Sequence, residues 1–208
     1  MFNLELPPEQ IDDLIYTNFH SMSGDDYTKA SSFEELLAKI GDFMGLYKVN
    51  TGKDMNLVFF KDAIKHLCRI TRTLRQPKGN VLLIGVGGSG RQSLTNLATY
   101  IAKCVFFQIE ITKNYKNQQW KDDLKKLLKI GGMEGKQVVF LFNDTQVLQE
   151  SMLEDINNML NTGEVPNLMG MEDIEEICGE VRAKCKELGI METKDAMMGF
   201  FIQNCREN

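Results

Sequence analysis

The chain has 208 residues, with 24 Lys or Arg against 29 Asp or Glu, so its formal charge at pH 7 is −5. That length suits one large domain or one domain with an appendage. With 43% hydrophobic and 25% charged residues, the composition indicates a folded chain with a sizeable core and excludes a disordered one. The acidic balance argues against nucleic acid as a partner, because binding to phosphate backbones needs clustered Lys and Arg.

The sequence shows no signal for a membrane span, for secretion or for a zinc-type metal site. Its longest nearly unbroken apolar stretch, residues 81–88, is far shorter than the roughly 18 residues that a membrane helix needs. No basic segment leads an apolar one at the N-terminus. Five cysteines without a Cys-x-x-Cys pair fit a reducing compartment such as the cytoplasm. With only His20 and His66 available, we expect no zinc-type site.

Residues 1–30 are expected to form an irregular N-terminal arm. They hold the Pro7-Pro8 pair and a turn signal, Ser-Gly-Asp-Asp, at residues 23–26. One short helix is expected within the arm, near residues 9–18.

Residues 31–78 are expected to form a helical lead-in segment. A helix begins after Ser31 or Ser32, which can cap it, and a second helix over about residues 55–74 is closed by Pro77. Apolar residues recur at helical spacing, at Phe33, Leu36, Leu37, Ile40, Phe43 and Met44 in the first helix and at Leu57, Phe60, Ile64, Leu67, Cys68 and Thr71 in the second.

Residues 79–170 alternate between apolar strands and amphipathic helices. The expected strands are residues 81–84, 105–111 and 138–142, and the expected helices are residues 90–103 and 117–130, the latter ended by a Gly-Gly pair. This order predicts a parallel sheet with helices on its faces. A helix near residues 150–161, a turn at 162–166 and a tail over 171–208, largely helical to about residue 204, follow.

A glycine-rich loop directly follows the first expected strand. Gly85, Gly87, Gly88 and Gly90 precede a helix, so successive backbone N–H groups and the positive end of the helix dipole can converge on one anion. Glycine suits these positions because a side chain would hold the backbone away from the anion's oxygens, and because positive φ is required at some of them. The pattern predicts a phosphate site. A tight turn without a ligand is the alternative.

Two kinds of phosphate site fit this loop. Gly85, Gly87 and Gly90 match G-x-G-x-x-G, the dinucleotide-binding pattern. Glu110 lies twenty residues after Gly90, where such a fold binds a ribose hydroxyl. Gly85 and Gly90 equally match the triphosphate loop G-x-x-x-x-G-K-[ST], with Arg91 in the place of Lys. A cation directly after the last glycine favours a triphosphate, because dinucleotide loops rely on backbone groups.

The third expected strand carries Asn143 and Asp144 at its carboxyl end. A P-loop NTPase places there the acid that holds magnesium, and AAA+ proteins follow it with a glutamate that orients water. Asn143 lacks the charge that retains a dication. Asp144 is one methylene shorter than glutamate, and a carboxylate misplaced by about 1 Å can cost about a hundredfold in rate. We therefore expect nucleotide binding with slow or absent hydrolysis.

Several segments together resemble the fourth AAA+ module of axonemal dynein heavy chains. They are residues 57–63, 85–94, 107–111, 140–146, 153–158 and 163–168, in the family's order and spacing, and the likeness runs from about residue 33 to the end. The resemblance implies a three-layer αβα P-loop NTPase fold with a parallel sheet in the strand order 5-1-4-3-2. Because only three strands are found, we expect a truncated fold that lacks strands 4 and 5 and the helical lid.

The resemblance also implies which residues form the site. Those around the phosphates are Gly85, Val86, Gly87, Gly88, Ser89, Gly90, Arg91, Gln92 and Ser93, with Leu57, Val58 and Phe59 beside the base. Core packing is the alternative for the three apolar residues. Gln92, Ser93 and Asn143 are implied as weak magnesium ligands, and Asn143 and Asp144 as degenerate catalytic positions.

The implied function is that of a regulatory or structural ATP or ADP site in a ring-shaped motor that walks on microtubules. Its implied partners are the other AAA+ modules of the same heavy chain, the dynein complex subunits and, through the parent motor, microtubules. The implied location is the cytoplasm, the cytoskeleton and the axoneme of the cilium. A Rossmann-type dinucleotide-binding domain that uses Glu110, and a ligand-free structural piece of the motor ring, remain open.

Overall fold

The structure, a computed structural model, describes residues 15–19, 27–55 and 57–208, and the chain divides into two compact units, residues 1–103 and 104–208. The Pro7-Pro8 pair, the turn at residues 23–26 and His20 lie outside the described residues. So does most of the helix expected near residues 9–18. At the end of that range, Tyr16–Thr17 form strand β1, which pairs antiparallel with β2, Thr28–Lys29, so the helix prediction is wrong there.

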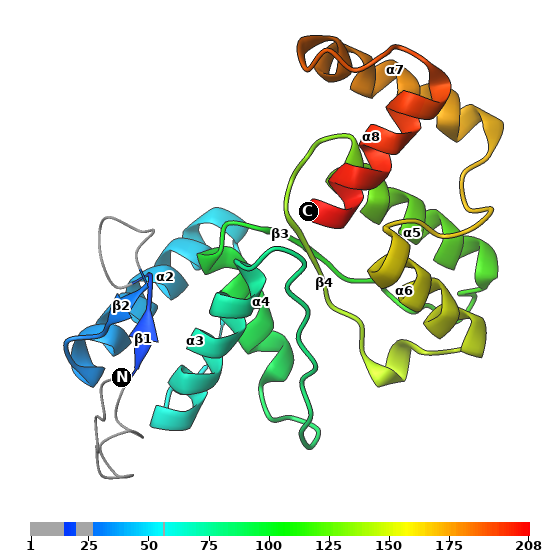
Figure 1. Cartoon of the computed structure of the whole chain (residues 1–208). Helices are drawn as coiled ribbons and strands as arrows, with labels where there is room; N and C mark the ends of the chain where they lie inside the picture. Colours follow the sequence, from blue (N-terminus) through cyan, green and yellow to red (C-terminus); the bar gives the residue numbers. More distant parts are fainter. Residues whose placement is uncertain (1–14, 20–26, 56) are drawn as a thin grey trace, which may run out of the picture. The chain divides into compact units, whose positions relative to one another are not determined.

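The first unit is built around the helices α2, Phe33–Thr51, α3, Lys61–Leu74, and α4, Arg91–Ile101 (Figure 1). Helix α2 begins where its cap predicts, because the side-chain oxygen of Ser32 accepts a hydrogen bond from the Glu35 amide at 3.1 Å. The core of the unit contains Leu36, Ile40, Ile64, Leu67, Leu97 and Ile101, all nearly inaccessible to water. This confirms the apolar face predicted for the middle of α2 and of α3.

Helix α3 begins at Lys61, later than predicted, because the residues just before it are extended. In extended backbone, successive side chains face opposite sides. Leu57 and Phe59 accordingly pack against the core, while Val58 and Phe60 are 87% and 63% exposed. The prediction that Phe60 belongs to the buried helix face is therefore wrong.

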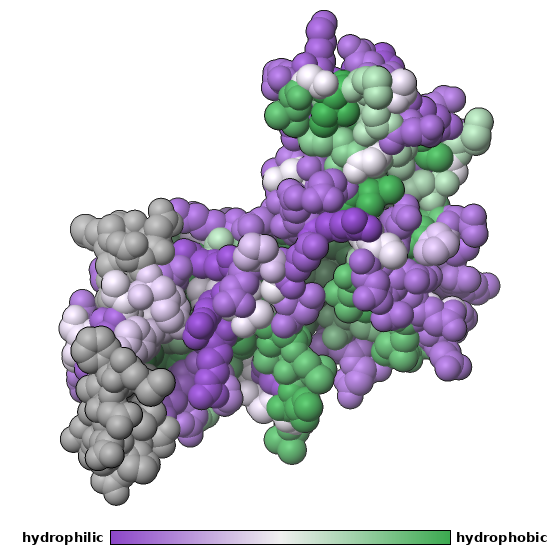
Figure 2. Space-filling model, viewed as in Figure 1, coloured by the Kyte–Doolittle hydropathy of each residue, from purple (hydrophilic) through white to green (hydrophobic). Residues whose placement is uncertain are grey.

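The strand predicted over residues 81–84 is not formed. This segment has no strand pairing, and Leu82 and Ile84 are 85% and 87% exposed, whereas Leu83 between them packs against the core. Figure 2 shows hydrophobic side chains gathered where the chain runs up to α4. In the order 5-1-4-3-2, the first strand lies between the fourth and the fifth, and neither is found among the described residues. Without a neighbour, the segment has no ladder of hydrogen bonds to hold it as a strand.

The second unit contains a two-stranded parallel sheet of β3, Val105–Phe107, and β4, Val138–Phe140, in which Val105 is opposite Val138. Both strands are shorter than predicted, but their parallel pairing confirms the α/β prediction. The helices of the unit are α5, Asn117–Gly132, α6, Glu150–Thr162, α7, Met171–Glu187, and α8, Lys194–Glu207, and a short 3₁₀ turn, η1, spans Asp144–Gln146.

The tail predicted as one largely helical segment is two helices, α7 and α8. Gly189, with a φ of +68°, marks the break, and the Thr193 side chain caps the new helix by accepting from the Ala196 amide at 3.3 Å. Both helices pack into the core of the second unit. Its buried members include Trp120, Leu124, Ile177, Val181, Cys185 and Phe201.

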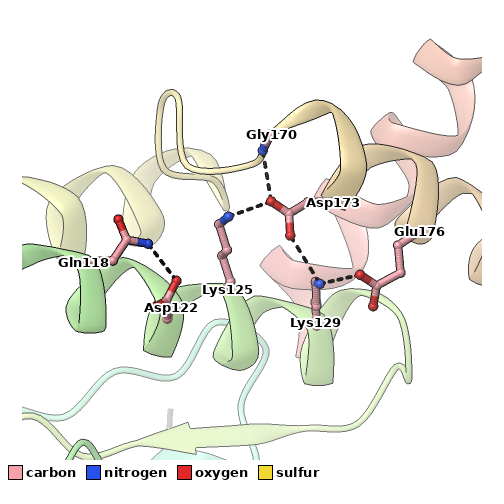
Figure 3. A network of polar contacts seen from close by, with 7 residues as sticks. All are labelled: Gln118, Asp122, Lys125, Lys129, Gly170, Asp173 and Glu176. Atoms are coloured by element: carbon pink, nitrogen blue, oxygen red, sulfur yellow. Dashed lines mark hydrogen bonds and ion pairs between the residues drawn. The ribbon is translucent and has the colours of Figure 1, made fainter.

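A network of ion pairs joins α5 to the start of α7 (Figure 3). Asp173 accepts from the Gly170 amide at 3.0 Å and pairs with the ammonium groups of Lys125 at 2.6 Å and Lys129 at 3.3 Å. Lys129 also reaches Glu176 at 2.7 Å. Desolvation raises the pKa of Asp173, but the hydrogen bonds from Lys125, Gly170 and Lys129 outweigh it, so the net shift of its pKa is downward.

Replacing Asp173 with asparagine is expected to lower the free energy of unfolding at pH 7 by about 1 kcal/mol, because two partly buried ion pairs lose their charge. Since the folded pKa is depressed, this contribution is present above the unfolded pKa near 4 and is lost as the pH falls through the folded value. Urea unfolding at pH 7 and pH 3 measures it. Asp122→Asn is the control, because within residues 15–19, 27–55 and 57–208 Asp122 accepts a hydrogen bond from Gln118 alone. Equal loss at both pH values would contradict the prediction.

Candidate functional site

The glycine loop of the first unit is an exposed bend between residue 84 and α4. Residues 85–89 are exposed, and Gly90 is the N-cap of α4. Gly88 and Gly90 both have a φ of +77°, which side-chain-bearing residues adopt only with strain. The sequence analysis expected positive φ at some of these glycines, and the structure confirms it.

The loop is exposed from residue 85 to residue 89, and several of its amides have no hydrogen-bond partner among the described residues. A methyl group added at Gly87 or Gly88 would meet no atom within 4 Å. Within the described part of the chain, the amides of Gly87, Gly88 and Gly90 donate no hydrogen bond, whereas the Ser89 amide reaches the Val86 carbonyl at 3.3 Å. Several donors beside the N-terminus of an 11-residue helix form a setting suited to an anion, because the helix dipole adds positive potential there. The loop therefore fits a phosphate group.

Arg91, the first residue of α4, turns its side chain back along the loop. Its guanidinium donates from Nη1 to the Leu83 carbonyl at 3.4 Å and from Nη2 to the Val86 carbonyl at 3.1 Å. The sequence analysis placed Arg91 among the phosphate-binding residues and missed these contacts. No pattern in the sequence signals them, because they depend on the path of the loop.

The other predicted site residues of the first unit lie partly in its core and partly at its surface. Leu57 lies beside the loop, since its Cδ2 is 3.9 Å from the position of a methyl group added at Gly90. Phe59 packs against the core and Val58 faces solvent. On the first turn of α4, Gln92 is exposed and Ser93 is half-buried.

In the second unit, a buried glutamine fixes the end of β4. The Gln146 side chain accepts from the Asn143 amide at 2.8 Å and donates to the Ile109 carbonyl at 2.6 Å. It thereby links the chain after β4 to the chain after β3. Gln146 is 7% exposed. The sequence analysis gave it no role, and a polar residue two positions after the Asn-Asp pair is a weak signal.

The predicted catalytic and ribose-binding positions follow these two strands. Asn143 is half-buried, and Asp144 is exposed and accepts from the Thr145 amide at 2.9 Å. Glu110 is exposed directly after Ile109. These residues belong to the second unit, whereas the glycine loop and Leu57 belong to the first. Among the described residues, no three His, Cys, Asp or Glu side chains gather as a metal site, and none of the described helices is long and apolar enough to cross a membrane.

The family model for the P-loop containing dynein motor region D4 matches residues 55–208. This chain belongs to that family. The match includes both the glycine loop and the strand that carries Asn143. It also agrees with the fold, because an αβα P-loop protein combines a parallel sheet with flanking helices.

The chain is similar in sequence to axonemal and flagellar dynein heavy chains. It is 43% identical to dynein axonemal heavy chain 1 of Rattus norvegicus over 198 residues, which cover 94% of this chain and 4% of that protein. It is 49% identical over 154 residues to the dynein-1-beta heavy chain, flagellar inner arm I1 complex, of Chlamydomonas reinhardtii, covering 74% of this chain and 3% of the relative. The chain thus spans only a small part of the relatives that it matches.

Proposed function

We propose that this dynein D4 chain binds ATP or ADP, with the nucleotide's phosphates held by the backbone of residues 85–92. The observation that carries the proposal is the set of open amides at Gly87, Gly88 and Gly90, at the N-terminus of α4. The proximity of Leu57 to Gly90 supports the proposal that Leu57 contacts the base. Backbone donors bind a phosphate without any side-chain charge, so the departure from lysine at Arg91 does not remove the anion site.

The proposed site hydrolyses its nucleotide slowly or not at all. Asn143 has a neutral amide at the position where a carboxylate would hold magnesium. Gln92 likewise has a neutral amide at the position where a hydroxyl would bind the ion. Asp144, whose carboxylate already accepts from the Thr145 amide, is shorter than the glutamate that orients water. Magnesium, when bound, would neutralise charge on the phosphates, with Gln92, Ser93 and Asn143 as its weak ligands.

In its parent protein, the proposed site regulates or stabilises a microtubule motor. The relatives are named as axonemal or flagellar heavy chains, which supports a place in the axoneme of the cilium and the cytoskeleton. The proposed partners are the other AAA+ modules of the same heavy chain, further subunits of the dynein complex and microtubules. An adenine-nucleotide site that turns over slowly suits a regulatory or structural module better than the main source of force.

Nucleotide binding is tested by replacing Gly88 with alanine in the 208-residue chain. We expect affinity for fluorescent ATP and ADP analogues to fall about tenfold or more, because a side chain at a φ of +77° displaces the amides that face the phosphates. Gly52→Ala is the matched control, since Gly52 also has positive φ and open surroundings, at the far end of α2. Equal loss in both variants would argue against the site.

The unsubstituted chain also separates the proposal from its alternatives. If the chain bound an NAD analogue in preference to ATP, the proposal would be replaced by a dinucleotide-binding site that uses Glu110. No binding of any nucleotide by a sample that is folded by circular dichroism would favour a ligand-free structural role.

Hydrolysis is tested with the same chain, saturated with ATP and magnesium. We expect turnover well below about 1 per second, because Asn143 lacks the charge that retains magnesium and Asp144 is too short to orient water. A phosphate-release assay measures it. Turnover of about 1 per second that Asp144→Ala abolishes would show that Asp144 does orient water, and would refute this part of the proposal.

A further inference from the structure

Arg91 joins three parts of the chain around the glycine loop. Its backbone starts α4, its Nη1 donates to Leu83 just before the loop, and its Nη2 donates to Val86 within the loop. The two carbonyls flank Gly85. One side chain therefore spans the bend from the helix to the segment that enters it.

The Arg91 side chain lies beside Gly85. A methyl group added there would lie 3.2 Å from the Ser89 hydroxyl, 3.5 Å from Cδ of Arg91 and 3.6 Å from its Nε. The Arg91 stem thus lies against the bare backbone of Gly85. Such a methyl group would be tight only against Ser89 and at ordinary contact distance from Arg91, whereas Gly87 and Gly88 have open surroundings.

The entering segment has few other attachments that would hold the bend. Residues 81–84 pair with no strand among the described residues, and Leu82 and Ile84 are exposed. Between residues 85 and 89, one backbone hydrogen bond joins the Ser89 amide to the Val86 carbonyl, at a long 3.3 Å. The loop also contains four glycines, whose backbone loses more conformational entropy on ordering than that of other residues. A brace that orders the loop before a ligand arrives would reduce the entropic cost of binding.

We propose that Arg91 is a positioning residue that braces the glycine loop through the Leu83 and Val86 carbonyls, so that the amides of Gly87 and Gly88 are ordered for the phosphates. Its influence on the nucleotide passes through the loop backbone and needs no direct contact with phosphate. The effect of Arg91 on nucleotide affinity rests on the proposed nucleotide function. The contacts of Arg91 with Leu83 and Val86 are present without a ligand.

The choice of arginine follows from the geometry. A planar guanidinium presents several donors in a fixed fork and can reach two carbonyls at once, whereas a lysine ammonium is a compact point charge on a flexible stem. A lysine here would keep the charge, which is all that direct pairing with phosphate requires, but it would lose the fork. Arg91→Lys therefore separates bracing from direct phosphate contact.

The experiment compares the unsubstituted 208-residue chain with Arg91→Lys, and uses Arg69→Lys, an exposed position on α3, as the control. Backbone ¹⁵N relaxation without nucleotide gives order parameters for Gly87 and Gly88. We expect values near 0.8 in the unsubstituted chain and in Arg69→Lys, and values below about 0.6 in Arg91→Lys. Affinity for fluorescent ATP and ADP should fall roughly tenfold in Arg91→Lys alone. The melting midpoint and the circular dichroism spectrum of Arg91→Lys serve as checks that the variant remains folded.

The possible outcomes are distinct. Unchanged order parameters in Arg91→Lys would overturn the brace. Lower order parameters with nucleotide binding as tight as before, or tighter, would overturn its role in positioning the amides. If the unsubstituted chain binds neither ATP nor ADP, the proposed function fails, and a drop in the order parameters with Arg91→Lys would still support the brace.

Discussion

Replacing Gly132 with alanine is expected to destabilise the second unit by about 1 to 3 kcal/mol, even though alanine is the better helix former. Gly132 is the last residue of α5, and a methyl group there would lie 2.3 Å from Cε2 of Phe201 and 2.6 Å from Sγ of Cys205 on α8. Phe201 is 2% exposed, so its ring has little room to move. The overlap forces α8 away from α5 or the ring out of its preferred rotamer.

The neighbouring glycine provides the control for this prediction. A methyl group at Gly131 would meet only Cβ of Asn208, at 3.9 Å, so Gly131→Ala should stabilise the unit by about 0.5 to 1 kcal/mol through helix propensity. Urea unfolding followed by fluorescence measures both variants, because Trp120 is the single tryptophan and lies buried in this unit. If Gly132→Ala were as stable as Gly131→Ala, the close packing of α8 on α5 would be wrong.

The helices were predictable from the sequence because their signals are local. Ser31 or Ser32 as the predicted cap locates the start of α2 to within a residue, and the Gly-Gly pair correctly marks the end of α5. The break between α7 and α8 has a local signal too, in Gly189 and the capping Thr193, although a single helical tail was predicted there. Such elements depend on residues that are near in the sequence.

The strand over residues 81–84 was not predictable in this way. Its apolar composition is that of a buried strand, but strand formation needs a neighbour, and pairing is a property of distant parts of the chain. Leu82 and Ile84 therefore remain exposed despite a sequence typical of a core.

The candidate site was predictable in its backbone and less so in its side chains. The glycine pattern correctly indicated an exposed loop with positive φ before α4, because only glycine adopts that conformation freely. The contacts of Arg91 with Leu83 and Val86, and of Gln146 with Ile109, join groups whose positions depend on the folded path. A motif fixes which residue stands at a position, and it does not fix where that side chain points.

Replacing Gly163 with alanine is expected to cost about 2 to 3 kcal/mol of unfolding free energy, from two separable causes. Gly163 ends α6 with a φ of +75°, and a methyl group there would also lie 2.4 Å from Cγ of Arg206 and 3.1 Å from the Ile202 carbonyl. Arg206 ties the same turn by donating to the Thr162 carbonyl at 2.6 Å. The methyl group therefore strains its own backbone and displaces α8.

The consequence of moving α8 extends to β4, the strand that precedes Asn143. The Asn208 carbonyl, at the end of α8, accepts from the Val138 amide at the start of β4 at 2.8 Å. Gly189→Ala separates the two causes, because Gly189 has a similar φ of +68° but open surroundings, and it should cost only about 1 kcal/mol. Urea unfolding gives the difference in unfolding free energy between the two variants. The rate of hydrogen exchange of the Val138 amide reports on β4. Equal costs at both glycines, with Val138 exchange unchanged, would mean that α8 does not pack on the α6 turn and does not support β4.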